Sequence, residues 1–135
     1  MDNFKHKETT NLLIKAFFKV YSTLGHGFIE KVYENAMVIE ARSLGLQVKQ
    51  QQPISVFYAD TIVGEYIADF IVNSAVIVEL KAVSKLTEVH EAQLMNYLKA
   101  TPYEIGLLLN FGPKVEFQRR IMDNNRKGNL SWYCE

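Results

Sequence analysis

Two carboxylates and a lysine interrupt an otherwise apolar part of this sequence. Asp69 lies within Ile62–Val72, and Glu79 and Lys81 lie within Ala75–Val83; both segments have the β-branched and aromatic composition of strands. Side chains alternate along a strand, so Glu79 and Lys81 are predicted to point to the same face. Burying such charges is unfavourable unless a metal ion, an ion pair or a reaction compensates. The spacing therefore predicts either a chemical site or a structural buried ion pair.

The connection between these two segments decides whether Asp69 and Glu79 share a face. If they are cross-strand neighbours, Ile67 pairs with Lys81 and Ile71 pairs with Ile77. Asn73–Ala75 then forms a three-residue loop, which is an acceptable hairpin connection. A two-residue turn would instead put the carboxylates on opposite faces. The chemical interpretation therefore predicts the longer loop.

If Asp69 and Glu79 converge, they offer hard oxygen ligands suited to Mg²⁺ or Mn²⁺. Lys81 would then position or help to deprotonate a water molecule, or stabilise negative charge on a phosphate. The alternative is a buried Glu–Lys or Asp–Lys ion pair that serves the fold alone, and this spacing by itself does not decide between the two.

A predicted helix at Thr87–Lys99 carries a polar stripe at helical spacing, made of His90, Gln93 and Tyr97. Gln93 and Tyr97 can hydrogen-bond a phosphate or hold the lysine, and a tyrosine can stack on a base. We interpret these two as functional and His90 as a solvated residue. The rest of the helix is expected to bury Val89, Ala92, Leu94 and Leu98.

The composition is that of one folded domain. The chain has 135 residues, of which 48% are hydrophobic and 22% charged, so we expect a single domain over residues 1–135. Lys plus Arg and Asp plus Glu both number 15, so no overall positive field indicates a nucleic-acid partner, although a local basic patch remains compatible with one. The one cysteine, Cys134, rules out an internal disulfide and is interpreted as an incidental thiol. With no recognisable signal peptide or membrane span, we expect a cytoplasmic protein.

The periodicity predicts an α/β fold with a mixed sheet. Three consecutive strands on short turns indicate an antiparallel meander, and a helical crossover then brings the next strand in parallel to a neighbour. The first two helices form a hairpin or one bent helix. The expected elements are helices at Thr9–Leu24 and Phe28–Leu44, strands at Leu46–Gln50 and Ile54–Tyr58 with a break at Gln50–Pro53, strands at Ile62–Val72 and Ala75–Val83, a helix at Thr87–Lys99, and strands at Ile105–Phe111 and Val115–Ile121.

The second predicted helix begins near a short glycine-containing motif, Gly27-x-x-Glu30-x-x-Tyr33. Glu30 falls in the first turn, where a carboxylate suits the helix N-terminus. Glu34 follows Tyr33 directly and is expected to face elsewhere, as ordinary surface.

This motif resembles the signature of the GxxExxY proteins, small bacterial and archaeal proteins of the PD-(D/E)xK nuclease superfamily. The similarity extends, in the family's order, through Gly25–Phe28, Val63–Asp69, Val78–Val83, His90–Lys99 and Gly106–Gly112. The restriction-endonuclease-like core of that superfamily agrees with the element order predicted above. Ala68 stands where the superfamily's name motif has proline, a substitution that the superfamily tolerates.

The resemblance implies a role for each matching position. Asp69 and Glu79 correspond to the acidic metal ligands and Lys81 to the catalytic lysine. The helical Glu30 and the backbone carbonyl of Leu80 correspond to further metal ligands. Gln93 and Tyr97 match the Q-x-x-x-Y element of some nuclease branches.

These residues together predict a Mg²⁺- or Mn²⁺-dependent nuclease that hydrolyses nucleic acid, with DNA as the expected substrate. The alternatives are a non-catalytic nucleic-acid- or protein-binding module, or a subunit of a larger complex. Trp132 and Tyr133 are candidate exposed aromatics for an interface or a homodimer. The basic residues of the last quarter either follow a phosphate backbone or form a solvated surface; they are Lys114, Arg119, Arg120, Arg126 and Lys127.

Overall fold

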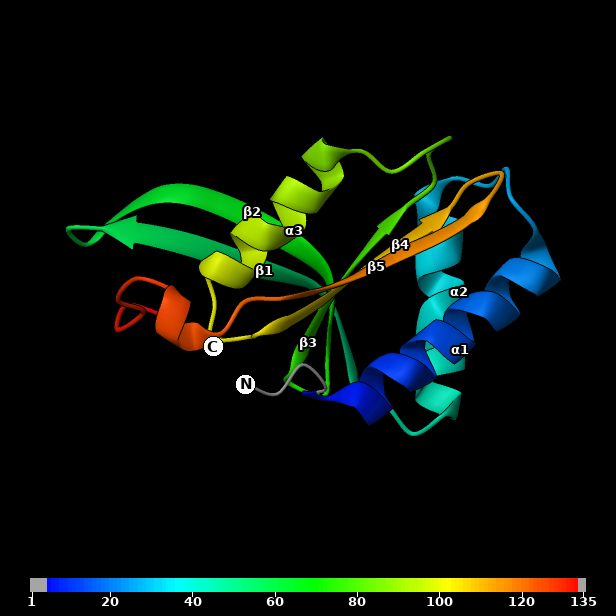
Figure 1. Ribbon diagram of the computed structural model, residues 1–135, viewed down its shortest axis with the longest axis horizontal. Coiled ribbons are helices and arrows are strands. Elements are labelled where there is room, and N and C mark those ends of the chain that lie inside the picture. The colour runs from blue at the N-terminus through cyan, green and yellow to red at the C-terminus, as the bar shows by residue number, and fades with distance from the viewer. Residues whose placement is uncertain (1–4, 134–135) are drawn as a thin grey trace.

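A five-stranded mixed sheet with helices on both faces forms the centre of the computed structural model, which describes residues 5–133 (Figure 1). Cys134 therefore lies outside the described residues. The elements are α1 (Lys7–Leu24), α2 (Glu30–Ser43), β1 (Val48–Tyr58), β2 (Thr61–Val72), β3 (Val76–Lys81), α3 (Glu88–Lys99), β4 (Ile105–Phe111), β5 (Val115–Ile121) and a 3₁₀ turn η1 (Asn124–Arg126).

The strands lie in the order β1-β2-β3-β4-β5. The first three form the predicted antiparallel meander, and β4 joins β3 in parallel, as the helical crossover predicts. All seven residues of β4 and the first five of β3 are buried, because helices cover both sides of these central strands. The predicted α/β fold class is confirmed.

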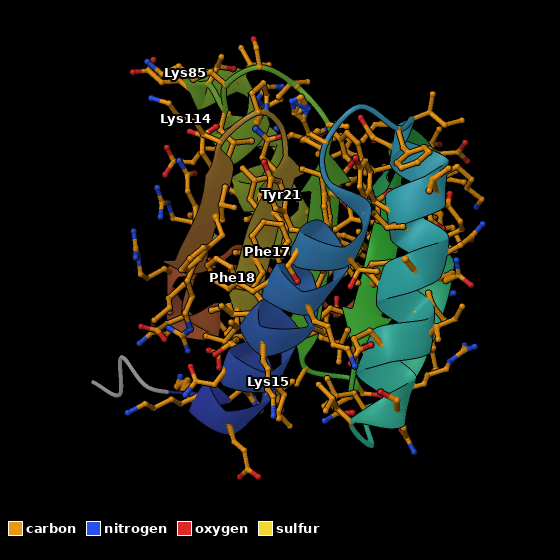
Figure 2. All side chains as sticks on the ribbon, turned by 90° about the vertical axis from the view of Figure 1, so that its right-hand side faces the viewer. Lys15, Phe17, Phe18, Tyr21, Lys85 and Lys114 are labelled. Carbon is orange, nitrogen blue, oxygen red and sulfur yellow. The ribbon has the colours of Figure 1, made fainter. Side chains whose placement is uncertain are left out.

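The two helices α1 and α2 cover one face of the sheet. They remain separate, with Gly25 at positive φ ending α1, a conformation that glycine adopts at little cost. Aromatic residues form the centre of this layer: the Phe111 ring stacks on Tyr33 at 4.3 Å between centroids and meets Phe17 edge-on at 4.8 Å. Figure 2 shows Phe17, Phe18 and Tyr21 on the side of α1 that faces β4 and β5, and the Tyr21 hydroxyl donates to the Gly112 carbonyl at 2.6 Å.

The other face of the sheet is covered by α3. Leu94 and Leu98 pack there against Ile77 and Leu108. No helix of residues 5–133 is both long and apolar enough to cross a membrane.

The β2–β3 hairpin has the predicted register next to its turn, but the predicted pairing of Ile67 with Lys81 is wrong, because β2 and β3 pair only as far as Phe70 and Val78. Ile71 pairs with Ile77, and Val72 pairs with Val76, so Asn73–Ala75 is the three-residue connection. Asn73 and Ser74 both have positive φ, and the Ala75 N–H donates to the Val72 carbonyl, which closes a tight turn with one extra residue.

The predicted break at Gln50–Pro53 is wrong, because β1 is continuous from Val48 to Tyr58. Pro53 is accommodated because β1 is an edge strand, where a missing N–H costs no sheet hydrogen bond. The chain is nevertheless distorted nearby, since Gln51 has a positive φ of 52°.

Side chains from the two halves of β2 pack in different layers of the protein. Phe70 packs in the α1–α2 layer, whereas Ala68, two residues earlier, packs in the α3 layer. Residues two apart on a regular strand share a face, so β2 twists sharply between them, at Asp69. Beyond this point the β1–β2 hairpin extends past the other strands and lies beside α3 (Figure 1).

Candidate active site

Asp69 and Glu79 meet where the twist separates β2 from β3. The Asp69 Oδ2 atom accepts a hydrogen bond from the Leu80 N–H at 2.7 Å, and the Glu79 Oε2 atom accepts one from the Asp69 N–H at 2.7 Å. Each carboxylate thus reaches across to the backbone of the opposite strand. Glu79 is only 4% exposed and Asp69 is half-buried, so the carboxylates lie close together and away from bulk water.

Burial makes it unfavourable for both groups to carry charge. Desolvation raises the pKa of Glu79 to about 8, and the nearby Asp69 charge adds to this. The pKa of Asp69 is also raised, first by desolvation, and only partly lowered by its bond from the Leu80 N–H. Lys81, half-buried at the end of β3, lowers the pKa of both carboxyls through its positive charge but does not cancel the effect of burial.

A divalent cation fits this pair of carboxylates. Among residues 5–133 no three His, Cys, Asp or Glu side chains are gathered as a ready-made metal site. Mg²⁺, however, commonly uses only one or two carboxylates and completes its coordination with water and substrate phosphate. Such a cation would relieve the repulsion between the two carboxylates, which burial makes unfavourable. Asp69 and Glu79 are the residues that would hold it.

Glu34 is not the surface residue that the sequence predicted. Its side chain is buried, and its oxygens accept hydrogen bonds from Gln50 Nε2 at 2.8 Å and Gln51 Nε2 at 3.0 Å. The negative charge of Glu34 raises the pKa of Asp69, and it does so more strongly than the negative charge of Glu30 does. The helix α2 therefore presents two carboxylates toward the site: Glu30, exposed at its first residue, and Glu34, buried one turn later.

A sequence signal for Glu34 did exist. Tyr33, Met37 and Ala41 form the buried stripe of α2, and Glu34 with Val38 borders this stripe at helical spacing. A carboxylate at such a position is partly covered by whatever the helix packs against. The glutamines of β1 that satisfy it come from a distant part of the chain, so its partners were not visible in the local sequence.

The signature tyrosine of α2 has a structural role. The Tyr33 hydroxyl donates to the Gly25 carbonyl at 2.6 Å and accepts from the Phe28 N–H at 3.2 Å. These bonds fix the loop before α2, including Gly27 at φ 115°. The loop in turn fixes where α2 begins, and hence the position of Glu30.

Tyr97 lies on α3 under the carboxylates. Its side chain is buried, and desolvation followed by the charges of Glu79 and Asp69 raises its pKa to about 12. Tyr97 therefore keeps its proton and can act only as a neutral hydrogen-bonding group. Gln93 is half-buried one turn earlier on α3.

Two predictions about α3 need correction. Val89 and Ala92 were expected to be buried, yet both are exposed, because α3 buries only Leu94, Tyr97 and Leu98. His90 is not simply solvated: its Nδ1 atom accepts the Thr87 N–H at 3.0 Å and so caps the helix.

Asn110, at the end of the central strand β4, was not predicted as a positioning residue. It is fully buried, and its amide holds both backbone groups of Val83, accepting from the N–H at 3.0 Å and donating to the carbonyl at 2.9 Å. Gly112 packs tightly behind this contact, since a Cβ atom there would lie 2.1 Å from the Val83 carbonyl oxygen. The segment that leaves Lys81 is therefore held rigidly against β4.

The predicted basic track in the last quarter is largely engaged within the protein. Arg119 bonds to the Lys5 carbonyl, Arg120 forms an ion pair with Glu91, and Lys127 donates to two backbone carbonyls. The two other basic residues, Lys114 and Arg126, are exposed. These side chains mainly tie the C-terminal segment to the domain.

The predicted exposure of Trp132 and Tyr133 is also wrong. Both are half-buried and pack against the α3 layer. Their position follows from the turn of the chain after β5, which local sequence did not reveal.

Comparisons with known proteins concern the family and the fold. A family profile described as the PD-(D/E)XK nuclease superfamily matches residues 7–121. Among solved structures, the crystal structure of SSO0001 is similar, with a TM-score of 0.55 and 14% sequence identity over 70% of this chain and 50% of that one. That similarity concerns the fold alone, and this chain spans half the length of SSO0001. A search of curated protein sequences finds no match.

Proposed function

Because this chain belongs to the PD-(D/E)XK nuclease superfamily, we propose that it is a divalent-cation-dependent nuclease that hydrolyses phosphodiester bonds of DNA. The motif around Tyr33 further leads us to group it with the GxxExxY proteins. The single observation that carries the proposal is the meeting of a buried carboxylate, Glu79, and a half-buried one, Asp69, beside Lys81.

Each residue has a role in this proposal that follows from its position. Asp69 and Glu79 hold Mg²⁺ or Mn²⁺, with Glu30 and the Leu80 carbonyl as further ligands. When bound, the cation supplies Lewis acidity that polarises the scissile phosphate.

The lysine and the α3 residues act on the substrate. The ammonium of Lys81 stabilises negative charge that develops on the phosphate. Gln93 and Tyr97 orient either the lysine, by accepting hydrogen bonds from its ammonium, or the phosphate, by donating hydrogen bonds to it. Tyr97 remains protonated throughout the neutral pH range because its pKa is about 12. Burial of the carboxylates excludes bulk water and strengthens these interactions.

One observation favours a second candidate, a nucleic-acid-binding module without catalysis. Both carboxylates are satisfied by backbone N–H groups at 2.7 Å, an arrangement that closes the gap between β2 and β3 without a cation. In that case the pair would serve the fold, and cleavage would be absent.

A cleavage panel tests the proposal. End-labelled single-stranded, duplex and branched DNA, and matching RNA, are incubated with the protein and Mg²⁺ or Mn²⁺, and with EDTA as the metal-free control. We expect DNA cleavage with either cation, products with 5′-phosphate and 3′-hydroxyl ends, and none in EDTA. Binding without cleavage of every substrate would contradict the nuclease proposal and support the second candidate. The Lys81→Met protein, purified identically, reports any contaminating nuclease.

A further inference from the structure

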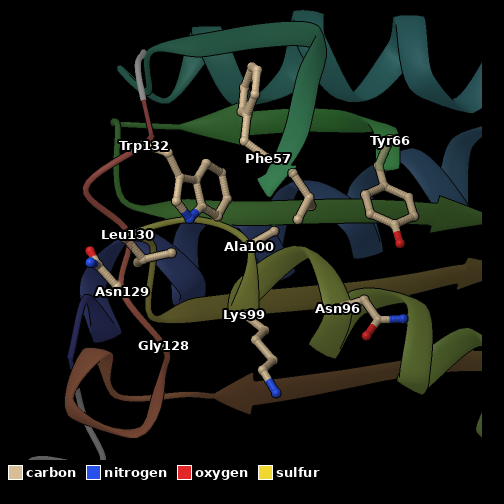
Figure 3. Close-up of a pocket in the computed structure, with 10 residues that line it drawn as sticks. Phe57, Tyr66, Asn96, Lys99, Ala100, Gly128, Asn129, Leu130 and Trp132 are labelled. Atoms are coloured by element: carbon tan, nitrogen blue, oxygen red, sulfur yellow. The ribbon is translucent and has the colours of Figure 1, made fainter. Parts of the chain in front are cut away.

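A cleft of about 340 Å³ lies beside the active site, between the far half of the β1–β2 hairpin, α3 and the C-terminal segment (Figure 3). Its volume falls at the lower end of the range for small-ligand pockets. The cleft is separate from the carboxylates, and the roles proposed above make no use of it.

Aromatic and aliphatic groups form the walls of this cleft. Trp132 and Phe57 lie at one end, with ring centroids 6.1 Å apart, and Leu130 and Ala100 are beside them. Tyr66 stands at the other end, near Asn96 (Figure 3). Flat apolar surfaces on several sides suit a planar ring that stacks rather than a flexible chain.

Polar groups at the edge of the cleft add a hydrogen-bonding pattern. Asn96 and Lys99 are exposed on the same side of α3, three residues apart. Asn129 also lines the cleft, and its Oδ1 atom accepts the Ser131 N–H at 2.8 Å. The carboxamide of Asn96 can read the edge of a base, and the ammonium of Lys99 suits the phosphate of the same nucleotide.

A contact between two tyrosine rings links the wall of the cleft to the active site. The Tyr66 ring, which lines the cleft, packs against Tyr97 with centroids 5.3 Å apart. Tyr97 in turn lies within the electrostatic influence of Glu79 and Asp69. A strand passing the carboxylates would therefore bring a neighbouring nucleotide to this cleft.

We propose that this cleft binds one unpaired nucleobase of the nucleic acid that is cut at Asp69 and Glu79. The proposal rests on the proposed function for the identity of its ligand. A paired base is stacked within its duplex and cannot enter a pocket unless it is extruded. The cleft therefore directs the enzyme toward single-stranded nucleic acid or toward unpaired nucleotides beside a duplex.

Trp132 provides a direct signal, because it is the only tryptophan in the chain. A six-nucleotide single-stranded DNA is titrated into the full-length protein in EDTA, which prevents cleavage, and Trp132 fluorescence is recorded. We expect saturable quenching by the stacked base. An abasic strand of equal length and a blunt duplex should not quench it.

Two variants in the cleft and one control outside it locate the binding. Phe57→Ala is expected to weaken the binding of the single strand about tenfold, the scale of one base–aromatic contact. Tyr58→Ala changes the neighbouring, 76% exposed tyrosine outside the cleft and should bind as the wild type does. Asn96→Ala, at an exposed helical position, should also weaken binding severalfold and does not depend on tolerance of a change in the hairpin packing.

The outcomes separate this proposal from the nuclease proposal. Equal quenching by the abasic strand or the duplex, or unchanged binding by both Phe57→Ala and Asn96→Ala, would overturn the nucleobase cleft even if the protein cleaves DNA. Base-dependent quenching in a protein that fails every cleavage assay would support the cleft and contradict only the nuclease proposal.

Discussion

Lys81→Met is expected to lower the rate of cation-dependent DNA cleavage by about 100- to 1,000-fold, the usual effect of removing one group that stabilises transition-state charge. Methionine keeps much of the apolar stem of lysine, so the half-buried position stays packed. Because Lys81 opposes a cation electrostatically, its loss should leave Mn²⁺ affinity unchanged or higher. Single-turnover cleavage and a Mn²⁺ titration of the same preparation measure the two effects.

Lys15→Met is the matched control for this prediction. Lys15 is exposed on α1, which covers the opposite face of the sheet from α3 (Figures 1 and 2), and its replacement should leave the cleavage rate unaltered. A Lys81→Met enzyme that cleaves at the wild-type rate would show that the lysine takes no part in the chemistry.

Glu79→Gln is expected to stabilise the metal-free protein, increasingly so as pH rises from about 5 to about 8.5. The pKa of Glu79 is about 8 in the folded protein against 4.5 as its reference value. Between these values the folded state binds more protons than the unfolded state, so the unfolding free energy of the wild type falls with rising pH. Glutamine does not titrate, and its oxygen can still accept the Asp69 N–H.

The gain should reach about 2–4 kcal/mol at pH 8.5 and nearly vanish at pH 5. Urea unfolding in EDTA at the two pH values measures it. Glu65→Gln, at an exposed position of β2, serves as the control and should show little change. A stability difference between Glu79→Gln and wild type that is the same at both pH values would contradict a buried, raised-pKa carboxylate.

The hairpin that carries the site was predictable because its information is local. The apolar composition located β2 and β3, and it left two registers open. Requiring Asp69 and Glu79 to meet selected the three-residue connection at Asn73–Ala75, which the structure has. The extents of β4 and β5 were also predictable, since β4 is an apolar run that ends at Gly112-Pro113, and β5 follows this turn and ends before a polar tail.

The features that escaped prediction depend on contacts between distant segments. Glu34 is buried because α2 packs near Gln50 and Gln51 of β1. These partners are distant in sequence, so the residues around Glu34 do not predict them. Pro53 suggested a break, yet its place on an edge strand, a property of the whole sheet, lets β1 continue. The twist at Asp69 likewise appears only when the two packed layers are known.

Titration of Mn²⁺ into the full-length protein tests most directly whether Asp69 and Glu79 form a cation site. Calorimetry of the wild type should show one Mn²⁺ bound per chain. Asp69→Asn, which keeps an oxygen to accept the Leu80 N–H, should lose that binding, whereas the exposed Asp60→Asn at the β1–β2 turn should retain it. Equal binding by Asp69→Asn and the wild type, or no binding by the wild type, would contradict the site.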